Sequence, residues 1–225
     1  MKRIALIILL LLFGGLVFTI YRGVSGVFPE HYQWNQRLTL VIDTPDGELL
    51  ATSVTQGSAN YTRVAIATSD HWGYGLYGEA IVADLGGGRY LFALLPNKQL
   101  AEAIFRDLMG DGDRRDLYQR LPHQAGMGAR RLTPEDYPLL VTFGDVSDPA
   151  SVVQVDPADL AATFGAGFAL REITLEVTDD AVTEGVVEGV LGWLEPLNGG
   201  YLHGGFTSKG APLGLSGLEF IRGEL

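Results

Sequence analysis

The side chains best suited to chemistry in this 225-residue chain are four histidines and a short acidic run. No two histidines lie three or four residues apart, so none forms a pair that could bind a metal from one helix face. The run GDGDRRD has aspartates at positions 1 and 3 of a calcium-type loop, but Arg115 and Asp116 occupy the places of an oxygen ligand and a glycine. We therefore expect a solvated turn and no metal site, although tertiary structure could still assemble one. The residues concerned are His31, His71, His123, His203, Asp111, Asp113 and Asp116.

Two further motifs fall short of a cofactor or catalytic site. Gly73, Gly75 and Gly78 have GxGxxG spacing, which binds a dinucleotide when a strand precedes it and a helix follows. The seven residues 79–85 before the next glycines are too few for that helix, so a glycine-rich loop entering a strand is favoured. Ser216 lies in GLSG, one residue short of the GxSxG motif, and could form a triad only with the distant His203 and an aspartate. The sequence thus predicts no catalytic, cofactor-binding or metal-binding residue.

Aromatic residues gather at two places in the sequence. Aromatic side chains in glycine-rich loops can form a recognition surface, but more often they cover a hydrophobic core. We expect the second role here and keep the first as an alternative. The groups are His71 and Trp72 with Tyr74 and Tyr77, and Trp193 with Tyr201 and His203.

Charge and composition restrict the partners of the chain. Its net charge is −11, and leaving out Lys2, Arg3 and Arg22 leaves 13 basic residues against 27 acidic ones, or −14. Such a surface repels nucleic acid and anionic lipid headgroups, so no nucleic acid is expected as a partner. The chain has no cysteine, which excludes disulfides, thiolate metal sites and a cysteine nucleophile. Nothing in the sequence identifies a small-molecule ligand.

The elements that would position these residues begin with strands. From Arg37 onward Leu38, Leu40 and Ile42 alternate with other residues, which is typical of a half-buried strand. The TPDG sequence at 44–47 favours a tight turn, because proline presets φ and glycine accepts a positive φ. Further strands are expected at 48–55, 61–68, 76–85, 89–95, 139–143, 152–155 and 170–178.

A few short helices are expected between the later strands. Asn97 can cap a helix to about Met109, whose Leu100, Ile104 and Leu108 would form one apolar stripe. Asp156 and Pro157 would begin a helix to Phe164 as its N-cap and first residue. Other helices are expected at 113–121 and, more weakly, at 183–194. The expected class is α+β, with antiparallel hairpins, a few short helices and a single soluble domain at 37–225.

The N-terminus carries the strongest signal in the sequence. After Lys2 and Arg3, the 17 residues 4–20 contain no charge, and as a helix they would span about 25 Å of a ~30 Å hydrocarbon core. Tyr21 and Arg22 can supply the missing length at the interface. The run is longer than a typical cleaved signal, and Gly23–Ser25 is a poor cleavage site. We therefore predict a signal-anchor at 1–22, with a cleaved signal or a buried core helix as alternatives.

The orientation of the anchor follows from its flanking charges. Positive charge stays on the cytoplasmic side, which places Lys2 and Arg3 inside and the C-terminal domain outside the cytoplasm. The chain would then cross the membrane once, with the bilayer as partner of residues 4–20. Residues 23–36 are expected to form a juxtamembrane linker in which Phe28, Tyr32 and Trp34 suit an interface or docking on the domain.

Two stretches carry a resemblance to a known group of proteins. They are GEAIVADLGGGRYLFALL at 78–95 and LLVTFGDVSDPASVVQVDPADLAATF at 139–164, continuing into LREITLEVTDD. They resemble a family of uncharacterised proteobacterial proteins, each with a hydrophobic N-terminus followed by one soluble domain. The resemblance implies a bacterial source and a single domain, and it provides no activity or site residue.

Two functional hypotheses follow from the sequence. The first is a membrane-anchored envelope protein whose domain is a non-catalytic binding or structural module, with another envelope protein as a further partner. The alternative is a hydrolase-type enzyme whose site is assembled from distant residues, with His71, His123, His203 and Asp111 as candidates. Because catalytic groups must lie near one another in a cavity, their positions in the fold separate these hypotheses.

Overall fold

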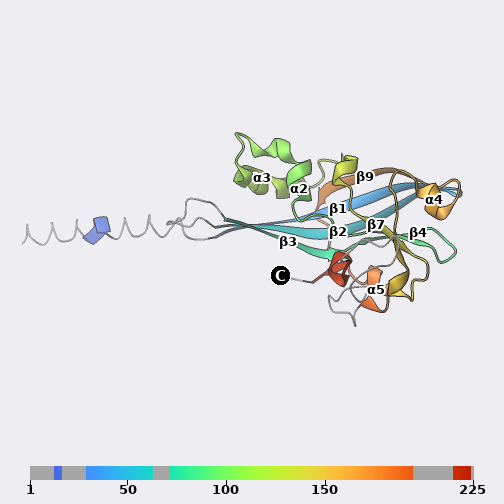
Figure 1. Ribbon diagram of the computed structural model, residues 1–225. Helices are drawn as coiled ribbons and strands as arrows, with labels where there is room; N and C mark the ends of the chain where they lie inside the picture. Colours follow the sequence, from blue (N-terminus) through green and yellow to red (C-terminus); the bar gives the residue numbers. More distant parts are fainter. Residues whose placement is uncertain (1–12, 17–28, 63–70, 195–214, 224–225) are drawn as a thin grey trace, which may run out of the picture. The chain divides into compact units, whose positions relative to one another are not determined.

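The computed structural model describes residues 13–16, 29–62, 71–194 and 215–223 (Figure 1). Its contacts divide the chain into two compact units. Unit 1 comprises Met1–Tyr32 and Ala59–Tyr74, and unit 2 comprises Gln33–Ser58 and Gly75–Leu225. Strands β1, β2 and β3, whose bounds follow, contribute residues to both units.

The described strands form two sheets. The six-stranded sheet has the order β10-β3-β2-β1-β9-β6, and β9 pairs antiparallel with both β1 and β6. The four-stranded sheet has the order β4-β5-β7-β8, and each of its pairings is antiparallel. The strands are β1 (Glu30–Thr44), β2 (Gly47–Thr62), β3 (His71–Glu79), β4 (Ile81–Asp84), β5 (Tyr90–Ala93), β6 (Arg130–Arg131), β7 (Leu140–Phe143), β8 (Val152–Gln154), β9 (Ala169–Thr178) and β10 (Ile221–Arg222).

The helices are short, and most of them connect two strands along the chain. The α-helices are α2 (Leu100–Ile104), α3 (Arg114–Arg120), α4 (Leu160–Phe164) and α5 (Val186–Val190). The 3₁₀ helices are η1 (Arg106–Met109), η2 (Leu121–Gln124), η3 (Pro134–Asp136), η4 (Pro149–Ser151) and η5 (Gly217–Glu219). The predicted class is confirmed: the described chain is α+β, rich in antiparallel strands and with a few short helices.

The first strand is longer than its hydrophobic alternation indicates. It begins at Glu30 and not at Arg37, so residues 30–36, which we had placed in the linker, are strand. Trp34 and Gln36 are buried on the same face as Leu38. Gln36 is tolerated there because its side chain accepts a hydrogen bond from Trp34 Nε1 (2.9 Å) and donates one to Thr55 Oγ1 (3.4 Å).

Other boundaries also differ from the expected ones. Strand β2 continues to Thr62, whereas we expected two separate strands at 48–55 and 61–68, and residues 63–68 lie outside the described part. The expected strand at 76–85 is divided into β3 and β4 at Ala80. The Ala80 N–H donates a hydrogen bond to Phe220 O at 2.8 Å. The hairpin at 86–88 is confirmed, since Leu85 N donates to Arg89 O between β4 and β5.

The helices are shorter than expected. The helix expected at 97–109 is divided into α2 and η1 around Phe105, which is 1% exposed and lies off the predicted stripe. Asp159, not Asp156, caps α4 by accepting from Ala162 N at 3.0 Å. The helix expected at 183–194 is reduced to α5, at 186–190.

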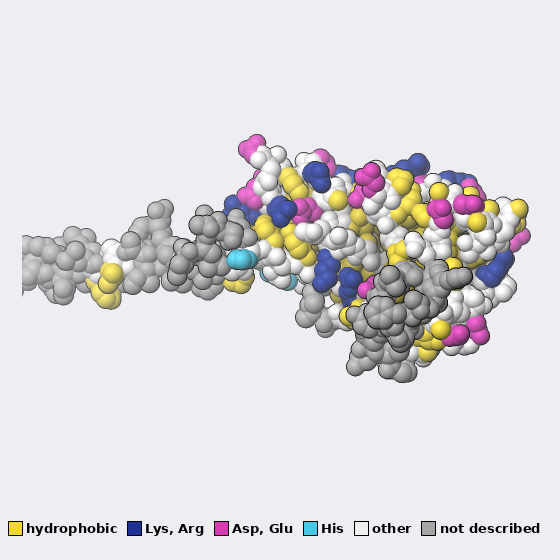
Figure 2. Space-filling model, in the orientation of Figure 1, with side chains coloured by type: hydrophobic (Ala, Val, Ile, Leu, Met, Phe, Trp, Pro, Cys, Tyr) yellow, Lys and Arg dark blue, Asp and Glu magenta, His cyan; other side chains and the backbone are white. Residues whose placement is uncertain are grey.

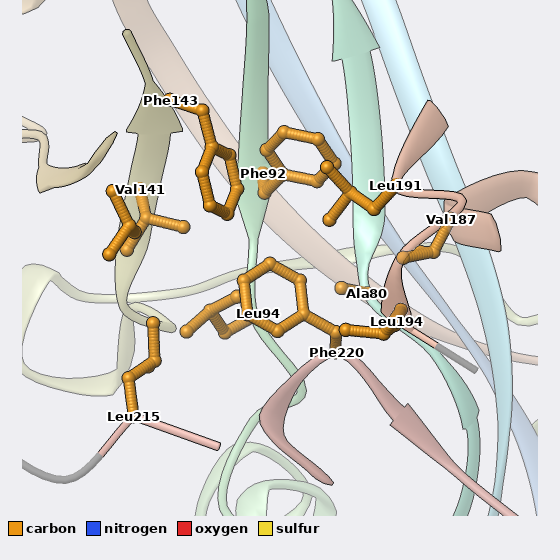
Figure 3. Packing of buried hydrophobic residues seen from close by; sticks show 11 residues of the cluster. Ala80, Phe92, Leu94, Val141, Phe143, Val187, Leu191, Leu194, Leu215 and Phe220 are labelled. Atoms are coloured by element: carbon orange, nitrogen blue, oxygen red, sulfur yellow. The ribbon is translucent and has the colours of Figure 1, made fainter. Parts of the chain in front are cut away.

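One core of unit 2 is built around three phenylalanines (Figure 3). Phe92 of β5 makes edge-to-face contacts with Phe143 of β7 and Phe220, at centroid distances of 5.5 and 5.9 Å. Valines and leucines complete the cluster, including Leu191 just after α5. The packing therefore joins the four-stranded sheet to the segments around α5 and η5.

A second packing site joins β1, β2 and α3 in unit 2. The Trp34 ring of β1 stacks on Tyr118 of α3 with centroids 5.5 Å apart, and both side chains are buried. Tyr118 donates a hydrogen bond to Glu102 at 2.7 Å. A Cβ at Gly57 of β2 would lie 2.4 Å from two Trp34 ring atoms, so the indole occupies the space that a side chain there would need.

Candidate functional site

The strand ends in unit 1 bring four aromatic rings together. Trp72 of β3 is central, with its ring centroid 6.5 Å from Tyr32 of β1, 4.9 Å from Tyr61 of β2 and 6.3 Å from Tyr74 of β3. The Tyr32 and Tyr74 rings stack on Trp72 at interplanar angles of 25° and 10°, and the Tyr61 ring is tilted by 46°. We call these four residues the strand-end aromatic cluster.

The cluster is partly exposed and almost uncharged. Tyr61 is buried, whereas Tyr32, Trp72 and Tyr74 are half-buried. Among the described residues of unit 1, Glu30 is the only Asp, Glu, Lys or Arg, and its carboxylate accepts a hydrogen bond from Tyr32 Oη. Neighbouring polar groups also pair with one another, since the exposed His31 ring hydrogen-bonds the Asn60 side chain.

The sequence indicated this cluster only in part. Trp72 and Tyr74 belong to the predicted group, but Tyr77 lies in unit 2 and donates to Glu184. Tyr32 was expected only as an interface or docking residue of the linker, and Tyr61 was missed, because strand pairing brings both to Trp72 and pairing cannot be read from one strand alone. An available signal was an aromatic residue near one end of each of three strands.

The second predicted aromatic group belongs to the core, as far as the structure describes it. Trp193 packs edge-to-face on Phe143 at 5.6 Å, and its Nε1 donates to Val146 O at 2.6 Å. Tyr201 and His203 lie outside the described residues. The part of this group that is described therefore covers the core, as expected.

Asp113 of the acidic run caps a helix and forms an ion pair. Asp113 is the N-cap of α3, accepting from Arg115 N at 2.9 Å and from the Arg115 guanidinium at 2.7 Å. The hydrogen bond from Arg115 holds the pKa of the Asp113 carboxyl below its ordinary value. Within the described residues, no group of three histidine, aspartate or glutamate side chains is placed to hold a metal ion.

The glycine motif and Ser216 also have structural roles. Gly73, Gly75 and Gly78 lie within strand β3, which replaces the loop we expected. Gly78 has a φ of 125°, and a Cβ there would lie 3.1 Å from Thr55 and Val182 methyl groups. Ser216 is the N-cap of η5, and its hydroxyl donates to Glu219 Oε2 at 2.5 Å in a capping box.

Two cavities of unit 2 allow a test of the enzyme hypothesis. One, of about 340 Å³, lies beside α2 and η3 and contains the Glu102–Arg114 ion pair, with the Arg114 Nε 2.9 Å from a Glu102 oxygen. The other, of about 240 Å³, is lined by Trp34, Pro122 and Val177 among others. His71, His123 and Asp111 line neither cavity, and His203 lies outside the described residues. The candidate catalytic residues are therefore not brought together in either cavity.

Some of the charged side chains on unit 2 form ion pairs with neighbours of opposite sign. Figure 2 shows acidic and basic side chains interspersed over the visible face. Arg37 pairs with Glu176 and Asp180 beside the β1–β9 ladder, and Arg171 pairs with Asp43 and Glu48. The hydrogen bonds that Arg171 donates to Asp43 raise the pKa of Arg171, and those that Arg130 donates to Asp107 lower the pKa of Asp107.

The N-terminal apolar run is described only at residues 13–16, which are helical. Phe13 and Leu16 are 65% and 57% exposed there. Among the described residues, no helix has both the length and the apolar character needed to cross a bilayer. The rest of the predicted anchor, and the linker up to residue 28, lie outside the described part.

Comparisons with protein-family models, with curated proteins and with solved structures returned no match. The resemblance of residues 78–95 and 139–164 to proteobacterial proteins therefore stays a prediction.

Proposed function

We propose that this chain is a membrane-anchored protein of the bacterial envelope whose folded part is a non-catalytic binding or structural module. Residues 4–20 would cross the inner membrane once, and the domain would lie outside the cytoplasm. The partners on this proposal are the bilayer and a further envelope protein.

The observation that carries the proposal is the uncharged run after Lys2 and Arg3, together with its described helical turn. Phe13 and Leu16 are large apolar side chains that are more than half exposed on that turn. Lipid would remove them from water, and burying such a side chain is worth about 1.5–3 kcal/mol. The flanking positive charges set the orientation.

The hydrolase alternative receives less support from the described residues. A catalytic site needs groups in near contact around a cavity that can hold a substrate. The described candidates His71, His123 and Asp111 line neither of the two cavities. The binding or structural role is therefore the one we propose.

Reporter fusions test this topology directly. A phosphatase that needs disulfides to fold is active only outside the cytoplasm, whereas a fluorescent protein can be chosen that matures only inside. With either reporter fused after Leu225, we expect phosphatase activity and no fluorescence. A matched fusion lacking residues 1–22 should show the reverse pattern. A full-length chain that is fluorescent and lacks phosphatase activity would overturn the proposed topology.

A further inference from the structure

The strand-end aromatic cluster has the side-chain chemistry of a bilayer interface. Tyrosine and tryptophan combine an apolar ring with one polar group, and they concentrate where a membrane meets water. Three of the four rings are half-buried, so the cluster is packed within unit 1 and still reaches its surface. Side chains whose only role is to fill a core are usually buried, so the exposed parts of these rings are available for a contact outside unit 1.

The charge of the region also favours a lipid surface over other surfaces of the chain. The whole chain carries −11, which opposes approach to anionic headgroups. Within the described part of unit 1, Glu30 is the only Asp, Glu, Lys or Arg, and Tyr32 donates a hydrogen bond to that carboxylate. The cluster can therefore approach a bilayer at a lower electrostatic cost than the acidic surface of unit 2.

Chain length restricts how far the cluster can lie from the proposed anchor. Only nine residues, 21–29, separate Ile20 from the first residue of β1. Nine residues span at most about 32 Å when fully extended, and Tyr32 follows two residues after Glu30. An anchor at 4–20 thus keeps the cluster close to the membrane surface, where even weak contacts form readily.

We propose that Tyr32, Trp72 and Tyr74, with the buried Tyr61 packed against Trp72, form a docking surface for the headgroup region of the bilayer that anchors the chain. The proposal rests on the proposed membrane anchor. It adds a second contact, through which the ends of β1, β2 and β3 are held at the lipid surface.

Depth-dependent quenching of tryptophan fluorescence tests the docking surface on the full chain. The protein is reconstituted into vesicles of phosphatidylcholine and phosphatidylglycerol, with bromine on acyl carbons either near the headgroup or near the chain end. The run 4–20 contains no tryptophan, so emission comes only from Trp34, Trp72 and Trp193. Trp72→Phe isolates the contribution of the cluster, and Trp193→Phe is the matched control because Trp193 packs on Phe143 in the unit 2 core.

The expected result is quenching of about one third of the emission by the shallow bromine and less by the deep one. Trp72→Phe should remove this quenching, and Trp193→Phe should keep it. Trp72→Tyr, which retains an interfacial side chain, is the second variant if Trp72→Phe does not fold. Equal quenching in the wild-type protein and a folded Trp72 variant would overturn the docking surface.

The same preparation distinguishes failure of docking from failure of the anchor. A chain that floats with the vesicles but shows no Trp72 quenching is anchored without docking, which contradicts this inference alone. A chain that does not float with the vesicles at all contradicts the proposed function, and the docking surface with it.

Discussion

At the scale of single residues, Glu79 is a buried carboxylate with a structural function. It is 4% exposed, and its oxygens accept from the backbone N–H groups of Gly185, Val186 and Val187, the last two at 3.0 and 2.9 Å. These N–H groups lie at the start of α5. The first N–H groups of a helix have no acceptor within the helix itself. A side chain from β3 therefore caps a helix about a hundred residues later in the sequence.

Replacing this carboxylate should destabilise the fold. In Glu79→Gln the amide NH₂ would face backbone donors, and we expect the free energy of unfolding to fall by about 1–3 kcal/mol. Urea denaturation followed by circular dichroism measures this. Glu188→Gln is the matched control, because Glu188 is exposed on α5 and its change should stay within about 0.5 kcal/mol. Equal effects of the two substitutions would contradict the capping role of Glu79.

Asp107 provides a prediction about acid stability. Its carboxylate pairs with Arg130, which also lies over the Phe105 ring at 4.3 Å. The hydrogen bond from Arg130 lowers the pKa of Asp107 from 3.8 in the folded state. A lowered folded-state pKa adds stability above the unfolded value, and this stability is lost as the pH falls below about 3.8.

Asp107→Asn should therefore reduce stability at pH 7 more than at pH 3. The pair is largely exposed to solvent, so we expect a loss of no more than about 1 kcal/mol at pH 7. Urea unfolding at both pH values measures the difference. Asp46→Asn, in the exposed turn between β1 and β2, should change stability at pH 7 by less than about 0.5 kcal/mol. A loss for Asp107→Asn that is larger at pH 3 than at pH 7 would contradict the assignment.

At the scale of elements, the packing of β1 on β2 depends on a glycine. Gly57→Ala would place a Cβ 2.4 Å from the Trp34 ring, which is enclosed by Tyr118. We expect a loss of about 1–3 kcal/mol, because the ring must shift within a packed core. Thermal unfolding and near-ultraviolet circular dichroism measure the effect.

Gly73→Ala is the matched control on β3. A Cβ there would meet its nearest neighbour, Asn60 Cβ, at 3.8 Å, which is an ordinary contact. Its stability should not fall, since alanine restricts the unfolded chain more than glycine does. If Gly57→Ala were as stable as Gly73→Ala, the close approach of Trp34 to β2 would be wrong.

The sequence predicted the strands better than their ends. The alternation of Leu38, Leu40 and Ile42 predicted β1 correctly, because these three alternating residues are buried. The strand extends upstream through the buried Gln36, whose side chain hydrogen-bonds Trp34 and Thr55. These side-chain hydrogen bonds leave no periodic pattern in the sequence. In the helix expected at 97–109 the buried residues are Leu100, Ala101 and Phe105, so only Leu100 of the predicted stripe is buried, and tertiary packing divided the element.

The candidate sites show the same limit. Two of the residues that resembled binding motifs are explained by local contacts: Asp113 caps α3, and Gly78 lies close to Thr55. The aromatic cluster required three strands to be paired in one register before Tyr32 and Tyr61 could be assigned to it. One sequence indicates the residue types available for a site, and pairing between strands decides which of them meet.

At the scale of the whole molecule, we propose that an acidic, well-packed α+β fold is joined to a bilayer through its N-terminus. The interspersed and paired charges of unit 2 suit a surface in water, whereas residues 4–20 contain no charge at all. On the proposed function, these two parts are held together by the short segment 21–29. The proposed function therefore requires residues 4–20 to lie in the lipid bilayer.

The most direct test is whether the full chain stays with membranes after extraction with high salt and with carbonate at alkaline pH. We predict that it remains in the membrane fraction and is released only by detergent. Leu12→Arg, at the centre of the run, should release a large fraction, because a central arginine costs about 2.5–3.5 kcal/mol on insertion. The matched control is Leu50→Arg at a side chain that is 60% exposed on β2, and it should be retained like the wild-type protein. Release of the wild-type chain by salt or carbonate alone would contradict the membrane anchor.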